Sequence, residues 1–250
     1  MQGILVVSFG TSFDETREKN ITAIEKMIES KGHKVYRAFT SNMIRRILAK
    51  RGILIDDTKE ALLRMKQDGF TQVKVLPTHL LYGEEYEKLQ GLVAEVMDEF
   101  ESVQICKPLL ANEEDGRRVL RAIYTDTQKD ADTALILMGH GTEHFYNAIY
   151  PALNFIATEI GYDDLYVCTV EGYPTFEDAV AWIQRKGFKK AVLAPLMLVA
   201  GDHAVNDMAS DEEDSLRTLL EGIFVSVSSN IKGLAEYPDV KELYLEHLEA

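Results

Sequence analysis

The sequence has few cationic residues for its length. It carries 27 Lys and Arg against 41 Asp and Glu in 250 residues, which leaves a formal net charge of −14. A protein that binds nucleic acid by neutralising phosphates needs net or clustered basic charge, so this composition argues against that class. The chain also lacks an apolar run that approaches the ~18–20 residues needed to cross a bilayer. We therefore expect no nucleic-acid partner and no membrane association.

Cysteine is equally scarce. Cys106 and Cys168 both lie in apolar, strand-like runs, and they do not form a C-x-x-C pair. We interpret them as buried small apolar residues rather than as a disulfide or a metal-binding pair. The segment 1–8 has neither the basic region nor the small-residue cleavage site of a secretory signal. These features together favour a cytoplasmic protein.

Short apolar runs alternate with longer segments of helical period. This alternation is typical of βαβ units around a mostly parallel sheet, and it predicts an α/β fold. The candidate strands are residues 4–9, 34–39, 73–77, 102–106, 133–138, 165–170, 191–195 and 223–227. The first helix is expected to begin at a capping box that opens with Ser12, and Gly32 is expected to end it.

Two motifs occur twice, in the same order. SFGTSF at 8–13 is echoed by MGHGTEHF at 138–145, and LPTHLLYGEEY at 76–86 is echoed by APLMLVAGDHA at 194–204. A repeat of this kind indicates a duplicated structural unit. We therefore predict two similar α/β lobes, each a mostly parallel sheet flanked by helices, at residues 1–128 and 129–250.

Three side chains able to bind a metal follow strands of the second lobe. His140, Glu171 and His203 each come after a different candidate strand. Open parallel sheets bind ligands beyond the carboxyl ends of their strands, so the three side chains can converge there. Two imidazoles and one carboxylate suit a borderline divalent ion such as cobalt, nickel, iron or zinc, and they leave coordination positions open. The alternative for each histidine alone is a structural hydrogen bond after a strand.

These motifs resemble a known family, the anaerobic cobaltochelatases of cobalamin (vitamin B12) biosynthesis, which are type II chelatases. The resemblance is carried by MGHGTEH at 138–144, TVEGYPTFEDA at 169–179 and APLMLVAGDHAVNDMASDEEDS at 194–215, and it extends to ILVVSFGTSF at 4–13 and LPTHLLYGEEYEKL at 76–89. It implies a two-lobed, ferrochelatase-like fold with a tetrapyrrole in a cleft between the lobes. The implied reaction is insertion of Co²⁺ into sirohydrochlorin without ATP.

The resemblance also carries the family's metal ligands over to His140, Glu171 and His203. Metal insertion requires the loss of two pyrrole N–H protons, which an imidazole or a carboxylate can accept. We expect His140 to be a ligand and the proton acceptor, with Glu171 and His203 completing the catalytic and metal-binding set.

Sirohydrochlorin carries eight carboxylates, which an acidic protein repels at long range. Polar groups of the first lobe are candidates to bind it: the SFGTS turn with Ser8, Thr11 and Ser12, and His79 after the third strand. The ring of Tyr82 could stack on the tetrapyrrole, and its alternative is an aromatic side chain of the core. For His79 the alternative is a hydrogen bond in the core.

Three basic side chains are further candidates to bind the substrate carboxylates. They are Arg45, Arg46 and Lys88, and their alternative is an ordinary solvated helix face.

Several alternatives stay open from the sequence. Nickel or iron could be the inserted metal, because affinity at a given set of ligands rises from Fe²⁺ through Co²⁺ to Ni²⁺. The substrate could be precorrin-2, the chain could be a non-catalytic carrier of the tetrapyrrole or the metal, and it could assemble as a homo-oligomer.

Overall fold

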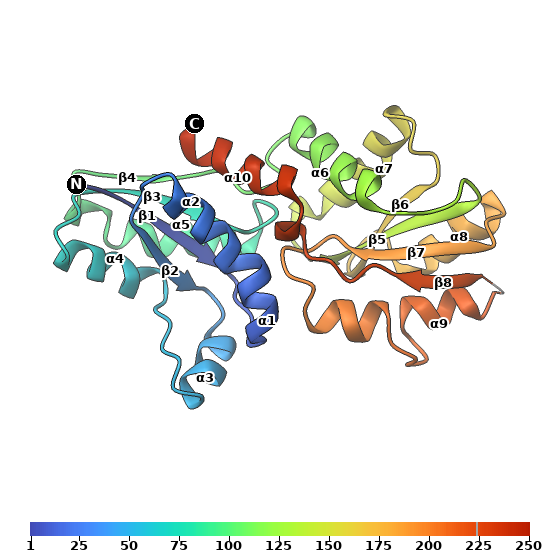
Figure 1. Cartoon of the computed structure of the whole chain (residues 1–250), viewed down its shortest axis with the longest axis horizontal. Coiled ribbons are helices and arrows are strands. Elements are labelled where there is room, and N and C mark those ends of the chain that lie inside the picture. Colours follow the sequence, from blue (N-terminus) through green and yellow to red (C-terminus); the bar gives the residue numbers. More distant parts are fainter. Residues whose placement is uncertain (224) are drawn as a thin grey trace. The chain divides into compact units, whose positions relative to one another are not determined.

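The computed structural model describes residues 1–223 and 225–250 of the chain. The chain divides into two compact units (Figure 1). The first comprises Met1–Ala111 with Lys241–Ala250, and the second comprises Asn112–Val240. The expected lobes, 1–128 and 129–250, differ from these units by the segment 112–128 and by the last ten residues; the division into those two lobes stays a prediction.

The first unit is built on a parallel sheet of four strands in the order β2-β1-β3-β4. The strands are β1 (Gln2–Ser8), β2 (Val35–Phe39), β3 (Gln72–Pro77) and β4 (Ser102–Ile105). The helices are α1 (Asp14–Arg17), α2 (Ala23–Ser30), α3 (Asn42–Lys50), α4 (Thr58–Gln67), α5 (Glu84–Ala94) and the larger part of α10 (Pro238–Glu249). A π-helical turn joins α1 to α2.

The central strand β1 explains why this sheet is parallel and covered on both faces. Its residues from Gly3 to Ser8 are all buried, a pattern that an antiparallel sheet with one wet face does not show. Leu5 and Val7 pack with residues of α4 and α5 on one face. On the C-terminal helix, the Tyr244 hydroxyl donates a hydrogen bond to the carbonyl oxygen of Thr78. That contact joins the end of the chain to the first unit.

The second unit repeats this plan with the strand order β6-β5-β7-β8. The strands are β5 (Thr133–Gly141), β6 (Leu165–Glu171), β7 (Lys190–Pro195) and β8 (Ser226–Ser229). The helices are α6 (Glu113–Asp126), α7 (Ile149–Glu159), α8 (Phe176–Lys186) and α9 (Leu216–Glu221), and a π-helical turn spans Ala204–Met208.

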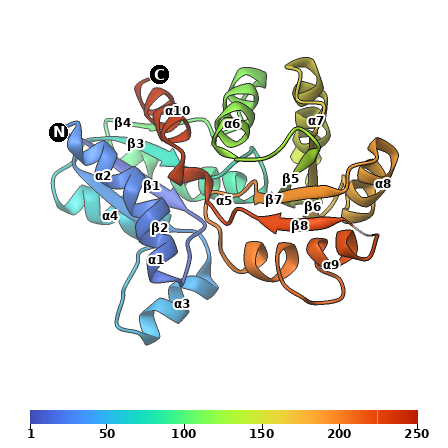
Figure 2. The same cartoon turned by 45° about the vertical axis from the view of Figure 1, so that its right-hand side comes forward.

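Helices lie on both faces of the second sheet, with α6 and α7 side by side on one face (Figure 2). On the other face, Ile136, Met138 and Leu193 of the sheet pack with Trp182 of α8 and Leu220 of α9. Alternate residues of β5 therefore enter different cores, and this explains why its run from 133 to 139 is apolar or small and buried throughout.

The α/β fold with two parallel sheets is confirmed. Seven of the predicted strands coincide with observed strands to within three residues at each end. The eighth, 223–227, includes residue 224, which lies outside the described residues, and the observed strand β8 begins at Ser226.

The expected capping box at Ser12 is wrong. Helix α1 begins at Asp14, its N-cap residue is Phe13, and no side chain caps it. The Thr11 hydroxyl accepts a hydrogen bond from the backbone N–H of Phe13, and Asp14 pairs with Arg17 at 2.5 Å and with Arg51. The turn before α1 is thus closed by the Thr11 hydroxyl, and the Asp14 carboxylate at the start of the helix forms ion pairs.

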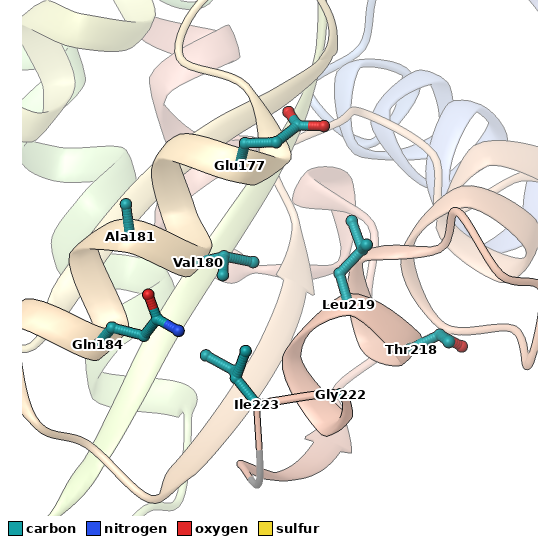
Figure 3. A pocket seen from close by; sticks show the side chains of 8 residues that line it. All are labelled: Glu177, Val180, Ala181, Gln184, Thr218, Leu219, Gly222 and Ile223. Atoms are coloured by element: carbon teal, nitrogen blue, oxygen red, sulfur yellow. The ribbon is translucent and has the colours of Figure 1, made fainter.

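A hollow of about 470 Å³ lies between α8 and α9 in the second unit (Figure 3). Val180, Leu219 and Ile223 give it an apolar lining, and Glu177 and Gln184 stand at its edge. None of its lining residues belongs to the predicted metal or substrate sets. Among the described residues, no helix combines the length and the apolar character required to cross a membrane.

We predict that removing an apolar side chain from the core of the second unit lowers the free energy of unfolding more than removing one from its surface. Ile136→Ala deletes a fully buried side chain from the central strand, and it should lower the free energy of unfolding by about 2–5 kcal/mol. The matched control is Ile231→Ala, whose side chain is 43% exposed and which should cost less than about 1 kcal/mol. Urea denaturation of both variants measures the difference. Equal losses would contradict this description of the core.

Candidate metal-binding site

The register of the second sheet brings the predicted ligands to one edge. His140 is the second-last residue of β5, and its neighbour Gly141 pairs with Glu171, the last residue of β6. On the other side, Met138 of β5 pairs with Pro195, the last residue of β7, and the chain reaches His203 eight residues later. Three strand ends of a parallel sheet therefore supply the three side chains.

The distances between these side chains are short. Nδ1 of His140 lies 3.9 Å from Oε2 of Glu171. The imidazole rings of His140 and His203 are 4.7 Å apart between centroids and meet edge to face at 87°. The side chains are 47% exposed for His140, 65% for Glu171 and 40% for His203, so solvent and a ligand can reach all three.

Each imidazole has its Nδ1 next to an acceptor. Nδ1 of His140 lies 3.1 Å from the carbonyl oxygen of Gly141, and Nδ1 of His203 lies 2.6 Å from Oδ2 of Asp207. A neutral ring that donates from Nδ1 keeps its lone pair on Nε2. Both histidines can therefore offer Nε2 to a metal, the arrangement typical of histidine ligands whose second nitrogen is hydrogen-bonded.

The three side chains are near one another but not yet gathered around a point. Across residues 1–223 and 225–250, no group of three or more His, Cys, Asp or Glu side chains already forms a metal-binding arrangement. Rotations about χ1 and χ2 of exposed side chains would be needed to complete the set.

Asn147 joins the two segments that follow the strands of His140 and Glu171. Its Oδ1 accepts a hydrogen bond from the backbone N–H of Thr142 at 3.1 Å, and its Nδ2 donates to the carbonyl oxygen of Tyr173 at 2.6 Å. One side chain thus holds the segment after β5 against the segment after β6. The spacing between His140 and Glu171 depends on this connection as well as on strand pairing.

Two glycines allow the strand ends to approach closely. Gly141 has φ +82°, and a Cβ built on it would lie 1.6 Å from the carbonyl oxygen of Glu171. A Cβ on Gly139 would lie 2.3 Å from the ring of Tyr150, whose hydroxyl accepts a hydrogen bond from Gly141 N–H at 3.4 Å. Burial raises the pKa of Tyr150 to about 12, so the hydroxyl stays protonated.

In the first unit, Ser8, Thr11 and Ser12 lie at the carboxyl end of β1. Ser8 is 1% exposed and its hydroxyl accepts a hydrogen bond from the Thr78 hydroxyl at 2.8 Å, while Thr11 is 5% exposed. The carbonyl oxygen of Ser12 accepts from Arg51. Ser8 and Ser12 are thus hydrogen-bonded to other parts of the first unit, and the binding of substrate by these three residues stays a prediction.

His79 follows β3 and has an unusual environment. Neither of its ring nitrogens has a hydrogen-bond partner among the described residues, and both are shielded from solvent. Burial lowers the pKa of His79 to about 4, although the carboxylate of Glu85 acts in the opposite direction. His79 is therefore a neutral imidazole with two unused polar atoms. Tyr82 packs edge to face on Tyr86 at 4.9 Å between ring centroids, over the core of the same unit.

Two of the three basic candidates, Arg45 and Lys88, form ion pairs with carboxylates of the first unit. The guanidinium of Arg45 donates to the carbonyl oxygen of Ile55 at 3.0 Å and pairs with the carboxylates of Asp57 and Glu60, which fastens α3 to α4. Lys88 pairs with Glu85 at 2.6 Å. Arg46 is exposed on α3. The structure therefore gives Arg45 a structural task, which disfavours it as a carboxylate-binding residue.

Comparison with known proteins decides the family. A family model described as Cobalt chelatase (CbiK) matches residues 2–250. The chain belongs to the cobalt chelatase (CbiK) family. It is therefore a chelatase, a lyase that acts on cobalt, and the family resemblance drawn from its motifs is confirmed.

Two curated relatives cover almost the whole chain. The sirohydrochlorin cobaltochelatase of Salmonella typhimurium is 35% identical over 251 residues, covering 99% of this chain and 95% of the relative. The sirohydrochlorin cobaltochelatase CbiKC of Nitratidesulfovibrio vulgaris is 30% identical over 255 residues, covering 100% of this chain and 90% of the relative.

Among solved structures, SirB from Bacillus subtilis with Fe³⁺ is similar with a TM-score of 0.69. The similarity covers 99% of this chain and 94% of that one, at 16% identity. At this identity the match concerns the fold, and it agrees with the α/β plan of a CbiK-family chelatase.

Three residues hold the candidate metal-binding edge together in a way that the sequence analysis did not assign to them: Asn147, Tyr150 and Asp207. Asp207 could have been found, because it stands four residues after His203 within the motif GDHAVND. Asn147 and Tyr150 gave no such indication, since their partners Tyr173 and Gly141 are known only once the loops are placed.

We predict that Gly141→Ala displaces Glu171 and removes activity. The added Cβ meets a backbone oxygen, which cannot rotate away, so the variant should lose more than about 2 kcal/mol of stability and most of its chelatase rate. The matched control is Gly187→Ala at the end of α8, where φ is +79° but the space around the Cβ is open. It should cost about 1–2 kcal/mol and leave the rate unchanged. Full activity in Gly141→Ala would contradict the close approach of the two strands.

Proposed function

We propose that this chain inserts Co²⁺ into sirohydrochlorin without ATP, as a step of cobalamin biosynthesis in the cytoplasm. The family supplies the metal, and the two relatives that cover nearly the whole chain at 35% and 30% identity are named for this substrate. The oligomeric state and the binding of the tetrapyrrole in a cleft stay predictions.

The metal ligands in this proposal are His140, Glu171 and His203. The observation that carries the assignment is that His140 lies near both other side chains at the carboxyl edge of the second sheet, 3.9 Å from Glu171 and with 4.7 Å between the two imidazole rings. Nitrogen and oxygen donors of this kind suit borderline divalent ions. The sequence alternative of isolated structural histidines leaves this proximity unexplained.

An exposed set of three ligands suits delivery of an ion better than its storage. A structural metal site closes its coordination sphere with four protein ligands, whereas a set of three leaves positions for water or for an incoming ligand. The side chains here are 40–65% exposed. The pyrrole nitrogens of the substrate can therefore take the open positions before the protein ligands leave.

The same side chains can receive the protons that the substrate loses. Metal insertion releases two N–H protons from the macrocycle, while the Co²⁺ ion takes two positive charges away from the protein ligands. As the ion departs, the lone pairs of His140 and Glu171 become free, and each can accept one proton before passing it to water. The charge of the ligand set is then nearly the same before and after transfer. We assign proton acceptance to His140 and Glu171 as a pair, because interacting groups do not titrate one by one. Within the pair, His140 is the proposed first acceptor.

The first unit contributes binding of the substrate in this proposal. Of the five residues predicted for that role, His79 has an observation in its favour: two shielded ring nitrogens without partners. An unpaired buried polar atom is costly, and a carboxylic acid or pyrrole group of the substrate would relieve that cost. Ser8, Thr11, Ser12 and Tyr82 remain candidates on sequence grounds.

We predict that the imidazoles of the second unit are required for catalysis. In anaerobic mixtures of sirohydrochlorin and Co²⁺, the absorbance change should slow by at least about 100-fold in His140→Ala and in His203→Ala. Loss of a metal ligand should reduce the rate at least as much as loss of a residue that only orients a ligand. The matched control is His33→Ala, an exposed histidine of the first unit, which should keep the parent rate.

The same assay separates the alternatives. Nickel or iron in place of Co²⁺ tests the inserted metal, and the spontaneous rate without protein sets the baseline. Parent rates in both His140→Ala and His203→Ala would refute the ligand assignment. If the parent protein does not exceed the spontaneous rate with any of the three metals, the remaining hypothesis is a non-catalytic carrier of the tetrapyrrole or the metal.

A further inference from the structure

His203 has a carboxylate partner that belongs to neither the predicted metal set nor the predicted substrate set. Its Nδ1 lies 2.6 Å from Oδ2 of Asp207, four residues later in the chain. Both side chains are about two-fifths exposed, at 40% and 39%. The pair is therefore formed at the surface of the second unit, on the side where His203 meets the ring of His140.

The backbone around this pair is anchored in the core. His203 stands at the start of the π-helical turn Ala204–Met208, and Ala204 and Met208 are both 0% exposed within the hydrophobic core of the unit. The backbone N–H groups of Ala204 and Val205 donate to the carbonyl oxygen of Gly201 at 3.1 and 3.2 Å. Two buried side chains flank the acidic residue, so its carboxylate is held in place relative to the imidazole.

A carboxylate in this position determines which nitrogen of the imidazole carries the proton. An ionised carboxylate only accepts hydrogen bonds, so the ring must donate from Nδ1 and keep its lone pair on Nε2. Without the partner, a free neutral imidazole places most of its hydrogen on Nε2, the nitrogen that would otherwise meet the metal. A histidine ligand held by a carboxylate is also a stronger donor.

We propose that Asp207 is a positioning residue that holds His203 in the Nδ1–H form and presents its Nε2 to Co²⁺. This rests on the proposed function for the role of His203 as a ligand. His140 reaches the same form by a weaker means, since its Nδ1 faces the neutral carbonyl oxygen of Gly141 at 3.1 Å. Asp207 therefore acts on one of the two imidazoles, and its effect passes through His203 alone.

The chain offers a charge-matched control on the same segment. The Asp202 carboxylate accepts a hydrogen bond from the side chain of Asn206 at 3.0 Å, and among the interactions of the described residues it forms no hydrogen bond or ion pair with His203. Asp202→Asn removes one negative charge close to the ligands and keeps an acceptor for Asn206. A general attraction of a cation by nearby carboxylates is therefore weakened in Asp202→Asn as it is in Asp207→Ala.

The first measurement needs neither metal nor activity. Long-range proton–nitrogen NMR of the nitrogen-15-labelled full chain at neutral pH reports which ring nitrogen of each of the six histidines is protonated, and His203→Gln assigns the signal. His203 should be in the Nδ1–H form in the parent and in Asp202→Asn, and should shift toward the Nε2–H form in Asp207→Ala. An unchanged form in Asp207→Ala would overturn the proposal.

The second measurement is Co²⁺ affinity by calorimetry. Asp207→Ala should weaken binding about 10–100-fold, Asp207→Glu should recover most of it, and Asp202→Asn should change it less than about 3-fold. In turnover the KM for Co²⁺ should rise while the KM for sirohydrochlorin stays constant. Equal losses in Asp207→Ala and Asp202→Asn would overturn the proposal, because they would show a general charge effect.

A double-variant cycle separates this proposal from the proposed function. In a His203→Ala background, Asp207→Ala should cause no further loss of Co²⁺ affinity, since its effect passes through the missing ring. A further 10-fold loss would overturn the positioning role and make Asp207 a ligand in its own right. Parent affinity in His203→Ala would instead refute the ligand assignment of the proposed function, while the NMR result would still test the Asp207 contact.

Discussion

Parallel pairing of β5 with β6 and β7 is the constraint on which the rest of the second unit depends. Because the three strands run in one direction, their carboxyl ends meet at one edge, and His140 comes within contact distance of residues 31 and 63 positions later in the sequence. The pairing of Gly141 with Glu171 sets the spacing to His140. The connection through Asn147 then holds the two loops at that spacing. A chelatase needs its ligands near one another and still open to substrate, and strand ends give both.

The two units share a plan but not a chemistry. Their strand orders, β2-β1-β3-β4 and β6-β5-β7-β8, are equivalent, and Gly10 and Gly141, which follow equivalent strands, both have positive φ. His140, however, corresponds to Phe9 in the first unit. The first unit instead keeps His79, whose lowered pKa makes it a neutral imidazole at physiological pH. A duplicated framework thus carries the proposed metal ligands in one copy and an imidazole suited to hydrogen bonding in the other.

The strands and the α/β fold with two parallel sheets could be predicted from the sequence, because buried parallel strands are continuous apolar runs. The metal ligands His140, Glu171 and His203 stay a prediction. What failed depended on the choice of hydrogen-bond partner. Ser12 had the spacing of a helix cap, but Thr11 closes the turn and Asp14 pairs with two arginines. Arg45 pairs with Asp57 and Glu60, contacts that its place in the sequence does not reveal, and its binding of a substrate carboxylate stays a prediction. Which of several nearby partners a side chain binds is determined by the tertiary structure, and it cannot be read from the local spacing of residues.

The central claim is that Co²⁺ is held at the carboxyl edge of the second sheet by His140, Glu171 and His203. Anomalous diffraction at the cobalt absorption edge, from crystals of the full chain grown anaerobically with Co²⁺, tests it most directly. The account predicts one dominant peak within about 2.0–2.3 Å of a nitrogen of each imidazole and an oxygen of Glu171. A dominant peak elsewhere, for example beside His79 and Glu85 of the first unit, with none at these three residues, would contradict it.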